Sequence, residues 1–90
     1  MKQKVILIID NMPEYLATRA EFVRAAGFSV ITATSPDQAR ELAQRQHIDL
    51  AVIDLRLLND DNPQDFTGLF LAEELHPSMK VILSTGFPEL

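Results

Sequence analysis

The feature that most constrains the fold is a short apolar run closing on an aspartate, which occurs twice. Val5–Asp10 reads Val-Ile-Leu-Ile-Ile-Asp, and Leu50–Asp54 repeats the pattern as Leu-Ala-Val-Ile-Asp. A third apolar run, Val81–Leu83, ends at the hydroxyl pair Ser84 and Thr85. Short runs rich in β-branched residues are typical of strands that are buried on both faces of a sheet. The sequence therefore predicts three buried strands, each ending in polar side chains.

Helical segments alternate with these strands. Pro13 and Pro36 suit the first turns of two helices, and Gly27 supplies a left-handed stop after the first of them. Asp65 or Thr67 is expected to cap a third helix. The expected order is strand 5–10, helix 13–26, strand 28–33, helix 36–46, strand 49–54, helix 67–76 and strand 81–84. This alternation predicts one α/β domain with a right-handed parallel sheet and helices on both faces.

Polar side chains are expected to gather at one edge of that sheet. In an open parallel sheet the ligand site lies outside the carboxyl ends of the strands, which here end in Asp10, Asp54, Ser84 and Thr85. Two neighbouring carboxylates repel unless a cation lies between them, and Mg²⁺ prefers such oxygen ligands. The hydroxyl of Thr85 suits a hydrogen bond to a phosphoryl oxygen. The sequence therefore predicts a magnesium and phosphoryl site at this edge.

Composition excludes several classes of function. The chain has 90 residues and a net charge of −5, and its eight Lys and Arg residues are scattered, which argues against nucleic-acid binding by this segment. The apolar runs are too short to span a bilayer, and the absence of cysteine suits a reducing compartment, so we expect a cytoplasmic protein. With only three glycines, the chain has no phosphate-cradling glycine loop of the Walker or dinucleotide type.

Four segments resemble the receiver (CheY-like) domain of two-component response regulators, over essentially the whole chain. They are Val5–Asn11, Asp54-Leu55, Gly68-Leu69 and Val81–Gly86. The resemblance implies a flavodoxin-like, doubly wound parallel sheet with the strand order 2-1-3-4. In the family the chain continues with a helix, a strand and a further helix, so residues 1–90 are expected to form a receiver-like domain that is incomplete at its C-terminus.

The resemblance also implies a function and a set of site residues. It implies a phosphoacceptor signalling domain rather than an enzyme, in which Asp54 receives phosphate from a histidine kinase or a phosphotransfer protein and Thr85 is the switch hydroxyl. Asp10 belongs to the acid pocket. The implied ligands of Mg²⁺ are Asp10, Asn11, Asp54 and the backbone carbonyl of Arg56.

The sequence departs from the receiver pattern in three ways. Asn11 stands where the family has a second acid, so a weaker affinity for Mg²⁺ is expected. The loop after Asp54 is longer than usual, and its acids Asp60, Asp61 and Asp65 are expected to be solvated rather than to crowd the pocket. The family's fifth-strand lysine is absent from these 90 residues. The chain is then either a fragment of a longer protein or a domain that cannot perform the whole chemistry.

Two other functions remain open at this point. Asn11 and the absent lysine favour a pseudo-receiver that is never phosphorylated and serves only in protein contacts. A fragment of another flavodoxin-like domain that binds a small anion at the same edge is the third possibility. Because the family's fifth strand and fifth helix are missing from these 90 residues, self-association is expected, through an open edge at Lys80–Ser84, a bare sheet face or the exchange of a segment between copies.

The helical patterns also predict which side chains are buried. Arg19 is expected to point outward from the first helix, and His47 and His76 are expected at the surface near helix ends. The aromatic residues expected in the core are Tyr15, Phe22 and Phe70.

Overall fold

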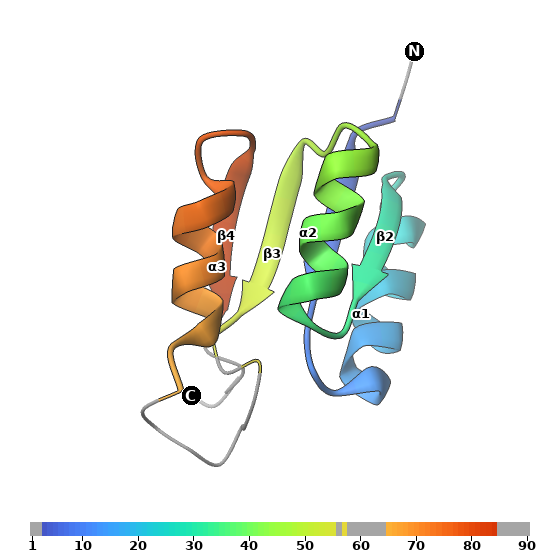
Figure 1. The fold of residues 1–90 in the computed structure, drawn as a ribbon. Coiled ribbons are helices and arrows are strands. Elements are labelled where there is room, and N and C mark those ends of the chain that lie inside the picture. The colour runs from blue at the N-terminus through green and yellow to red at the C-terminus, as the bar shows by residue number, and fades with distance from the viewer. Residues whose placement is uncertain (1–2, 56, 58–64, 85–90) are drawn as a thin grey trace.

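The computed structural model describes residues 3–55, 57 and 65–84, which form four strands and three helices (Figure 1). In chain order these are β1 Val5–Ile9, α1 Pro13–Ala25, β2 Ser29–Ala33, α2 Pro36–Arg45, β3 Leu50–Asp54, α3 Thr67–Leu75 and β4 Lys80–Ser84. Every predicted element is present, with ends that shift by at most a residue or two. No helix in these described ranges is long and apolar enough to cross a membrane.

The four strands form one parallel sheet in the order β2-β1-β3-β4, which confirms the predicted topology. Helices α2 and α3 cover one face of the sheet, and α1 covers part of the other, behind β1 and β2 in Figure 1. Because a helical crossover joins each strand to the next, all four strands run the same way and their carboxyl ends lie at one edge.

The core lies on both faces of β1, which explains its unbroken apolar run. Leu7 and Ile9 pack into the cluster beneath α2 and α3, whereas Ile6 and Ile8 pack with Leu16 of α1. These four β1 residues are buried, and Val5 at the start of the strand is half-buried. A strand whose alternate residues face two covered surfaces has no solvent side, so it shows no polar alternation.

Helix α1 presents to the sheet only one of its two apolar stripes. Leu16 and Ala20 are buried, and Val23 packs beside them at the three- and four-residue spacing of a single helix face. Tyr15 and Phe22 lie seven residues apart on a different face. The prediction that the aromatic side chains join the core was wrong. The exposed fractions are 57% for Tyr15, 81% for Phe22 and 65% for Phe70.

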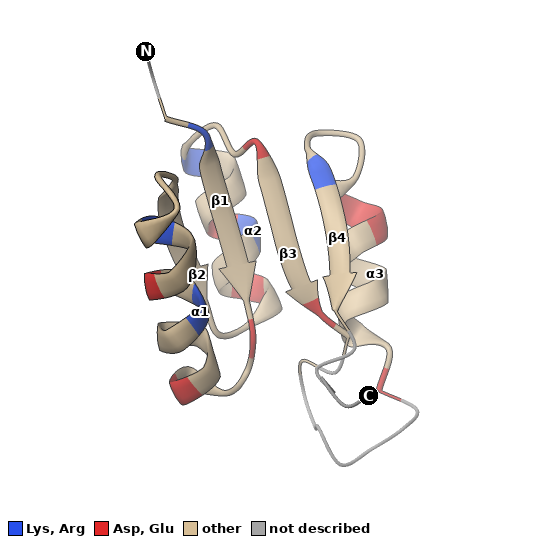
Figure 2. Cartoon of the chain, turned by 180° about the vertical axis from the view of Figure 1, so that it is seen from behind, with Lys and Arg blue, Asp and Glu red and all other residues tan. Residues whose placement is uncertain are grey.

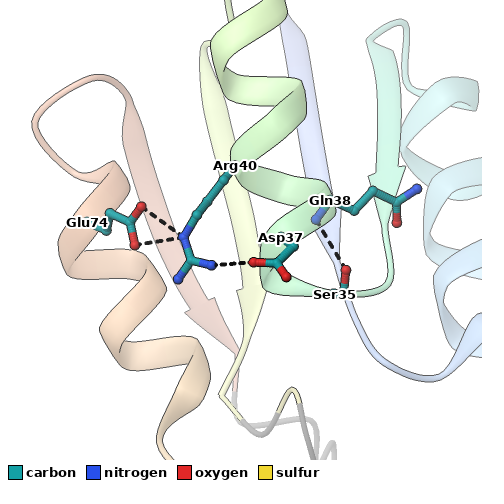
Figure 3. Close-up of polar contacts among 5 residues, drawn as sticks. All are labelled: Ser35, Asp37, Gln38, Arg40 and Glu74. Carbon is teal, nitrogen blue, oxygen red and sulfur yellow. Dashed lines mark hydrogen bonds and ion pairs between the residues drawn. The ribbon is translucent and has the colours of Figure 1, made fainter.

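Helix α2 is fixed at its start by a cap and linked to α3 by an arginine (Figure 3). The Ser35 hydroxyl oxygen accepts the Gln38 backbone N–H at 3.2 Å. Arg40 Nε donates to both carboxylate oxygens of Glu74 on α3, at 3.0 and 2.9 Å, and Arg40 Nη1 donates to Asp37 at 2.9 Å. Exposed pairs of this kind contribute about 0.2–1 kcal/mol each, so the contact aligns the two helices more than it stabilises the fold.

The opposite edge of the sheet, where the strands begin, is held together by Asp49. One carboxylate oxygen of Asp49 accepts the Val5 backbone N–H at 2.8 Å, and the other contacts His47 Nε2 at 2.8 Å. His47 lies at the surface, as predicted, but this pairing was not foreseen. The Val5 N–H, and after it the hydrogen bond to His47, lower the pKa of Asp49 below its usual value.

This lowered pKa predicts how stability depends on pH. The folded chain binds a proton at Asp49 less readily than the unfolded chain, so the Asp49 contribution is fully present above the unfolded pKa of about 3.9. It disappears as pH falls through the lower, folded pKa. We expect Asp49→Asn to lower the melting temperature at pH 7, and the gap from the parent chain to close in acid. Melting curves from pH 7 to pH 2 test this, and a gap that persists unchanged at pH 2 contradicts it.

Candidate functional site

Three neighbouring strands end side by side at the carboxyl edge of the sheet. Ile9 of β1 pairs with Ile53 of β3, so Asp10 and Asp54 each follow a paired residue on adjacent strands. Asp54 itself pairs with Ser84 of β4. Adjacent strands lie about 4.8 Å apart, which brings the two acids together. Figure 2 shows acidic segments at the ends of β1 and β3 on the same edge. Two other predicted site residues, Arg56 and Thr85, lie outside the described residues.

Asp10 is held by contacts from three directions. It is 2% exposed. Its Oδ1 accepts the backbone N–H of Met12 at 2.9 Å, and its own N–H donates to Ala33 O at 3.1 Å. Its Oδ2 accepts a hydrogen bond from Arg19 Nη1 at 3.2 Å, which also forms an ion pair. Arg19 therefore turns toward the site instead of pointing outward.

Asp54 lies at the end of β3, an inner strand of the sheet, and is 3% exposed. The backbone around it is fixed on two sides. The N–H of Leu55 donates to Ser84 O, and the N–H of Gly68 at the start of α3 donates to Leu55 O, both at 2.8 Å. A Cβ added at Gly68 would lie 1.9 Å from the carbonyl oxygen of Asp54. The first turn of α3 is thus packed directly against the backbone that carries Asp54.

Asn11 follows Asp10 directly in the chain and carries a third oxygen at this edge of the sheet. Its Oδ1 atom is buried and accepts no hydrogen bond from any of the described residues. A buried amide oxygen without a donor is destabilising unless water or an ion completes it. We use the name acid edge for the site formed by Asp10, Asn11 and Asp54.

The oxygens of the acid edge fit a hard divalent cation. Mg²⁺ binds proteins through one or two carboxylates, keeps several waters and accepts amide or carbonyl oxygens as well. Within residues 3–55, 57 and 65–84, no group of three or more His, Cys, Asp or Glu side chains is placed to hold a metal ion. The acid edge therefore offers two carboxylates and one amide oxygen. This small set is enough for Mg²⁺, which keeps waters as its other ligands.

One acid of the long loop has a structural role. Asp65 is buried, and its Oδ1 accepts both the backbone N–H and the hydroxyl of Thr67 at the start of α3. The prediction that Asp65 is solvated was wrong, because its carboxylate accepts an N–H at the start of the helix. The prediction that Asp65 or Thr67 occupies the cap position was also wrong, because Phe66 stands there, but Asp65 does contact the helix start. Asp60 and Asp61 lie outside the described residues.

Comparison with known sequences decides the family. A sequence profile for the response regulator receiver domain matches residues 6–90. The chain belongs to the response regulator receiver family. This receiver is 38% identical over 85 residues to the alginate biosynthesis transcriptional regulatory protein AlgB of Pseudomonas aeruginosa, covering 94% of this chain and 18% of that protein. It is 30% identical over 81 residues to the transcriptional regulatory protein GlrR of Escherichia coli, covering 90% of this chain and 18% of that protein.

Solved structures give the same family. A response regulator from Burkholderia pseudomallei, solved with a phosphorylated aspartic acid, calcium and citrate, is 26% identical with a TM-score of 0.73, over 97% of this chain and 49% of that chain. TrrA of Thermotoga maritima, in complex with Mg²⁺ and BeF, is 25% identical with a TM-score of 0.76, over 94% of this chain and 71% of that chain. The receiver fold predicted from the sequence is confirmed.

The sequence did not predict two features of this receiver site. The contact between Arg19 and Asp10 joins residues nine positions apart, and Arg19 had been assigned to the outer face of its helix. The close packing of Gly68 on Asp54 joins residues of α3 and β3. Gly68 lies in one of the segments that resemble the receiver family, and this resemblance was the only signal in the sequence that its position is constrained.

Proposed function

We propose that Asp54 of this receiver accepts a phosphoryl group from a histidine kinase or a phosphotransfer protein. The observation that carries the proposal is the burial of Asp54 at a strand end beside a second acid, Asp10. In the transfer, an Asp54 carboxylate oxygen forms a bond to phosphorus while the bond from phosphorus to the donor's imidazole nitrogen breaks. The product is an acyl phosphate on Asp54, and the electron pair of the broken bond stays with the imidazole. The phosphorylated aspartic acid of the Burkholderia pseudomallei receiver supports the same chemistry here.

We further propose that the acid edge holds Mg²⁺. Asp10, Asn11, Asp54 and the backbone carbonyl of Arg56 are the proposed ligands, and Thr85 is the proposed switch hydroxyl. When bound, Mg²⁺ neutralises negative charge on the carboxylates and the phosphoryl oxygens, which otherwise repel one another. The Mg²⁺ and BeF complex of the Thermotoga maritima receiver supports this choice of ion. We place the exchange in the cytoplasm, which a chain without cysteine suits.

Beryllofluoride, which stands in for a phosphoryl group on a carboxylate, tests this proposal. In the presence of Mg²⁺ it is expected to shift the amide NMR signals of Asp10, Asp54 and Ser84, while Asp54→Asn shows no such shifts. The Asp37→Asn variant is the matched control, because it removes one acid from an almost fully exposed position on α2. Unchanged spectra of the folded parent chain at high Mg²⁺ would reject phosphorylation and leave a pseudo-receiver.

Because the side chain of Asn11 is neutral, we expect Mg²⁺ to bind more weakly than it would with an aspartate at this position. Replacing Asn11 by Asp adds a negative charge beside the cation without changing the length of the side chain, so we expect the dissociation constant for Mg²⁺ to fall by roughly three- to tenfold. Isothermal titration with magnesium chloride measures the change. Equal or weaker binding by Asn11→Asp would show that this side chain is not a ligand.

A second candidate function is an interaction module, which the exposure of β4 favours. In the described part of the chain, β4 pairs on one side only, with β3. Ile82 and Leu83 of this strand remain 52% and 39% exposed. An apolar edge strand is a template for pairing with another chain. We propose that the 90-residue chain self-associates through β4 or the bare sheet face beside it.

Sedimentation equilibrium at micromolar concentration tests this self-association. We expect a mass greater than that of one chain, and we expect a charged substitution at the exposed position, Ile82→Lys, to return the chain toward a monomer. A monomeric parent chain in which the Val81 and Leu83 amides exchange with solvent as slowly as core amides would contradict the proposal.

A further inference from the structure

The ion pair between Arg19 and Asp10 gives the acid edge a cation of its own. The Asp10 side chain is almost fully buried, and a buried carboxylate is costly unless a positive charge or strong donors compensate it. Arg19, in the second turn of α1, reaches Oδ2 of Asp10 at 3.2 Å while its own side chain stays partly exposed. The fold thus neutralises Asp10 in the same place where the proposed metal has to bind.

The two oxygens of Asp10 differ in how easily their partners can leave. Oδ1 accepts a backbone N–H, from Met12 at the start of α1, and that donor is fixed by the chain. Oδ2 accepts its hydrogen bond from the long side chain of Arg19, which is partly exposed to solvent. Because Arg19 is partly exposed, its guanidinium can be solvated by water once another cation compensates the buried carboxylate of Asp10. Oδ2 is therefore the Asp10 oxygen whose partner is more easily displaced.

We propose that Arg19 is a built-in counterion that competes with a divalent cation for Oδ2 of Asp10. Arg19 thereby raises the Mg²⁺ concentration that is needed to occupy the metal site of this receiver. The inference rests on the metal site proposed above. Asn11 makes the competition effective, because it is uncharged and leaves the acid edge with two carboxylates instead of three. With Arg19 paired to one of them, the site attracts a further cation less strongly. Arg19 acts through Asp10, as a positioning residue, and has no part in bond making.

Titration with magnesium chloride, followed by calorimetry, tests the competition. Arg19→Gln is expected to bind Mg²⁺ roughly three- to tenfold more tightly than the parent chain, since the carboxylate regains its full charge. Arg45→Gln is the matched control, because Arg45 pairs with Glu41 on the exposed surface of α2 and the variant loses the same charge away from the site. Its Mg²⁺ affinity is expected to stay within about twofold of the parent value, because exposed charges beyond a Debye length are screened.

The same experiment separates competition from a purely structural role. If Arg19 only fastens α1 to the end of β1, Arg19→Gln lowers the melting temperature and leaves the Mg²⁺ affinity equal to that of Arg45→Gln. That result overturns the inference while the beryllofluoride test of Asp54 still stands. If neither the parent chain nor Arg19→Gln binds Mg²⁺ at any concentration, the inference and the proposed metal site both fall.

A measurement on the parent chain makes the test independent of whether the variant folds. The Nε–H signal of the Arg19 side chain is expected to shift in ¹⁵N NMR spectra as Mg²⁺ saturates the protein, because the guanidinium leaves Oδ2. The Arg45 signal is expected to stay in place. An Arg19 signal that does not move at saturating Mg²⁺ overturns the proposal.

Discussion

Gly68→Ala is expected to destabilise the chain by about 3 kcal/mol or more. The added Cβ would lie 1.9 Å from the carbonyl oxygen of Asp54 and 2.8 Å from both the carbonyl carbon of Asp54 and the Cα of Leu55. All three atoms belong to the backbone, so no side-chain rotation relieves the overlap. Either α3 moves away from the sheet or the end of β3 does, and each movement breaks the 2.8 Å hydrogen bond from Gly68 N–H to Leu55 O.

Urea unfolding measures this loss, and Gly27→Ala is its control. Gly27 has a positive φ of +102° with no atom within 4 Å of an added Cβ, so alanine there costs only the backbone strain of roughly 1–2 kcal/mol. Both variants lose glycine, but only Gly68→Ala creates an overlap. If Gly68→Ala unfolds at the same urea concentration as Gly27→Ala, α3 is not packed on Asp54 as described.

Asp54→Asn is expected to abolish Mg²⁺-dependent phosphorylation by acetyl phosphate. The amide that replaces the carboxylate is uncharged and has no anionic oxygen to attack phosphorus. The parent chain is expected to gain the mass of one phosphoryl group in intact-mass spectra, and Asp54→Asn is expected to gain nothing. Asp37→Asn, which removes an exposed acid from α2, is expected to behave like the parent chain. Equal phosphorylation of Asp54→Asn and the parent chain would mean that another residue is the acceptor.

The fold follows from sequence because its signals are local and repeated. The apolar runs that end at Asp10 and Asp54 mark inner strands, and the helix starts at Pro13 and Pro36 mark the crossovers between strands. Once the strands are parallel and each crossover is right-handed, the carboxyl ends must meet at one edge. The placement of Asp10 and Asp54 at one edge therefore needed only the order of the elements, whereas the adjacency of their two strands came from the resemblance to receiver domains.

Other features of the site depend on tertiary packing that no local pattern encodes. Arg19 reaches Asp10 only because α1 packs against β1 and β2, and a helical pattern alone assigned it to solvent. The same pattern assigned Tyr15 and Phe22 to the core, although one stripe of α1 suffices to cover the sheet there. For Asp65 the sequence left two roles open, a helix cap and a solvated loop acid, because the choice depends on where α3 begins.

Locating the phosphorylated residue tests the central claim most directly. After incubation with acetyl phosphate and Mg²⁺, borohydride reduces an aspartyl phosphate to homoserine, and peptide sequencing then identifies the modified position. We predict homoserine at Asp54, formed in the presence of Mg²⁺ and absent when the ion is chelated. Homoserine at another acid, or an unmodified and folded chain at high Mg²⁺, would contradict the assignment of Asp54 as the phosphoacceptor of this receiver.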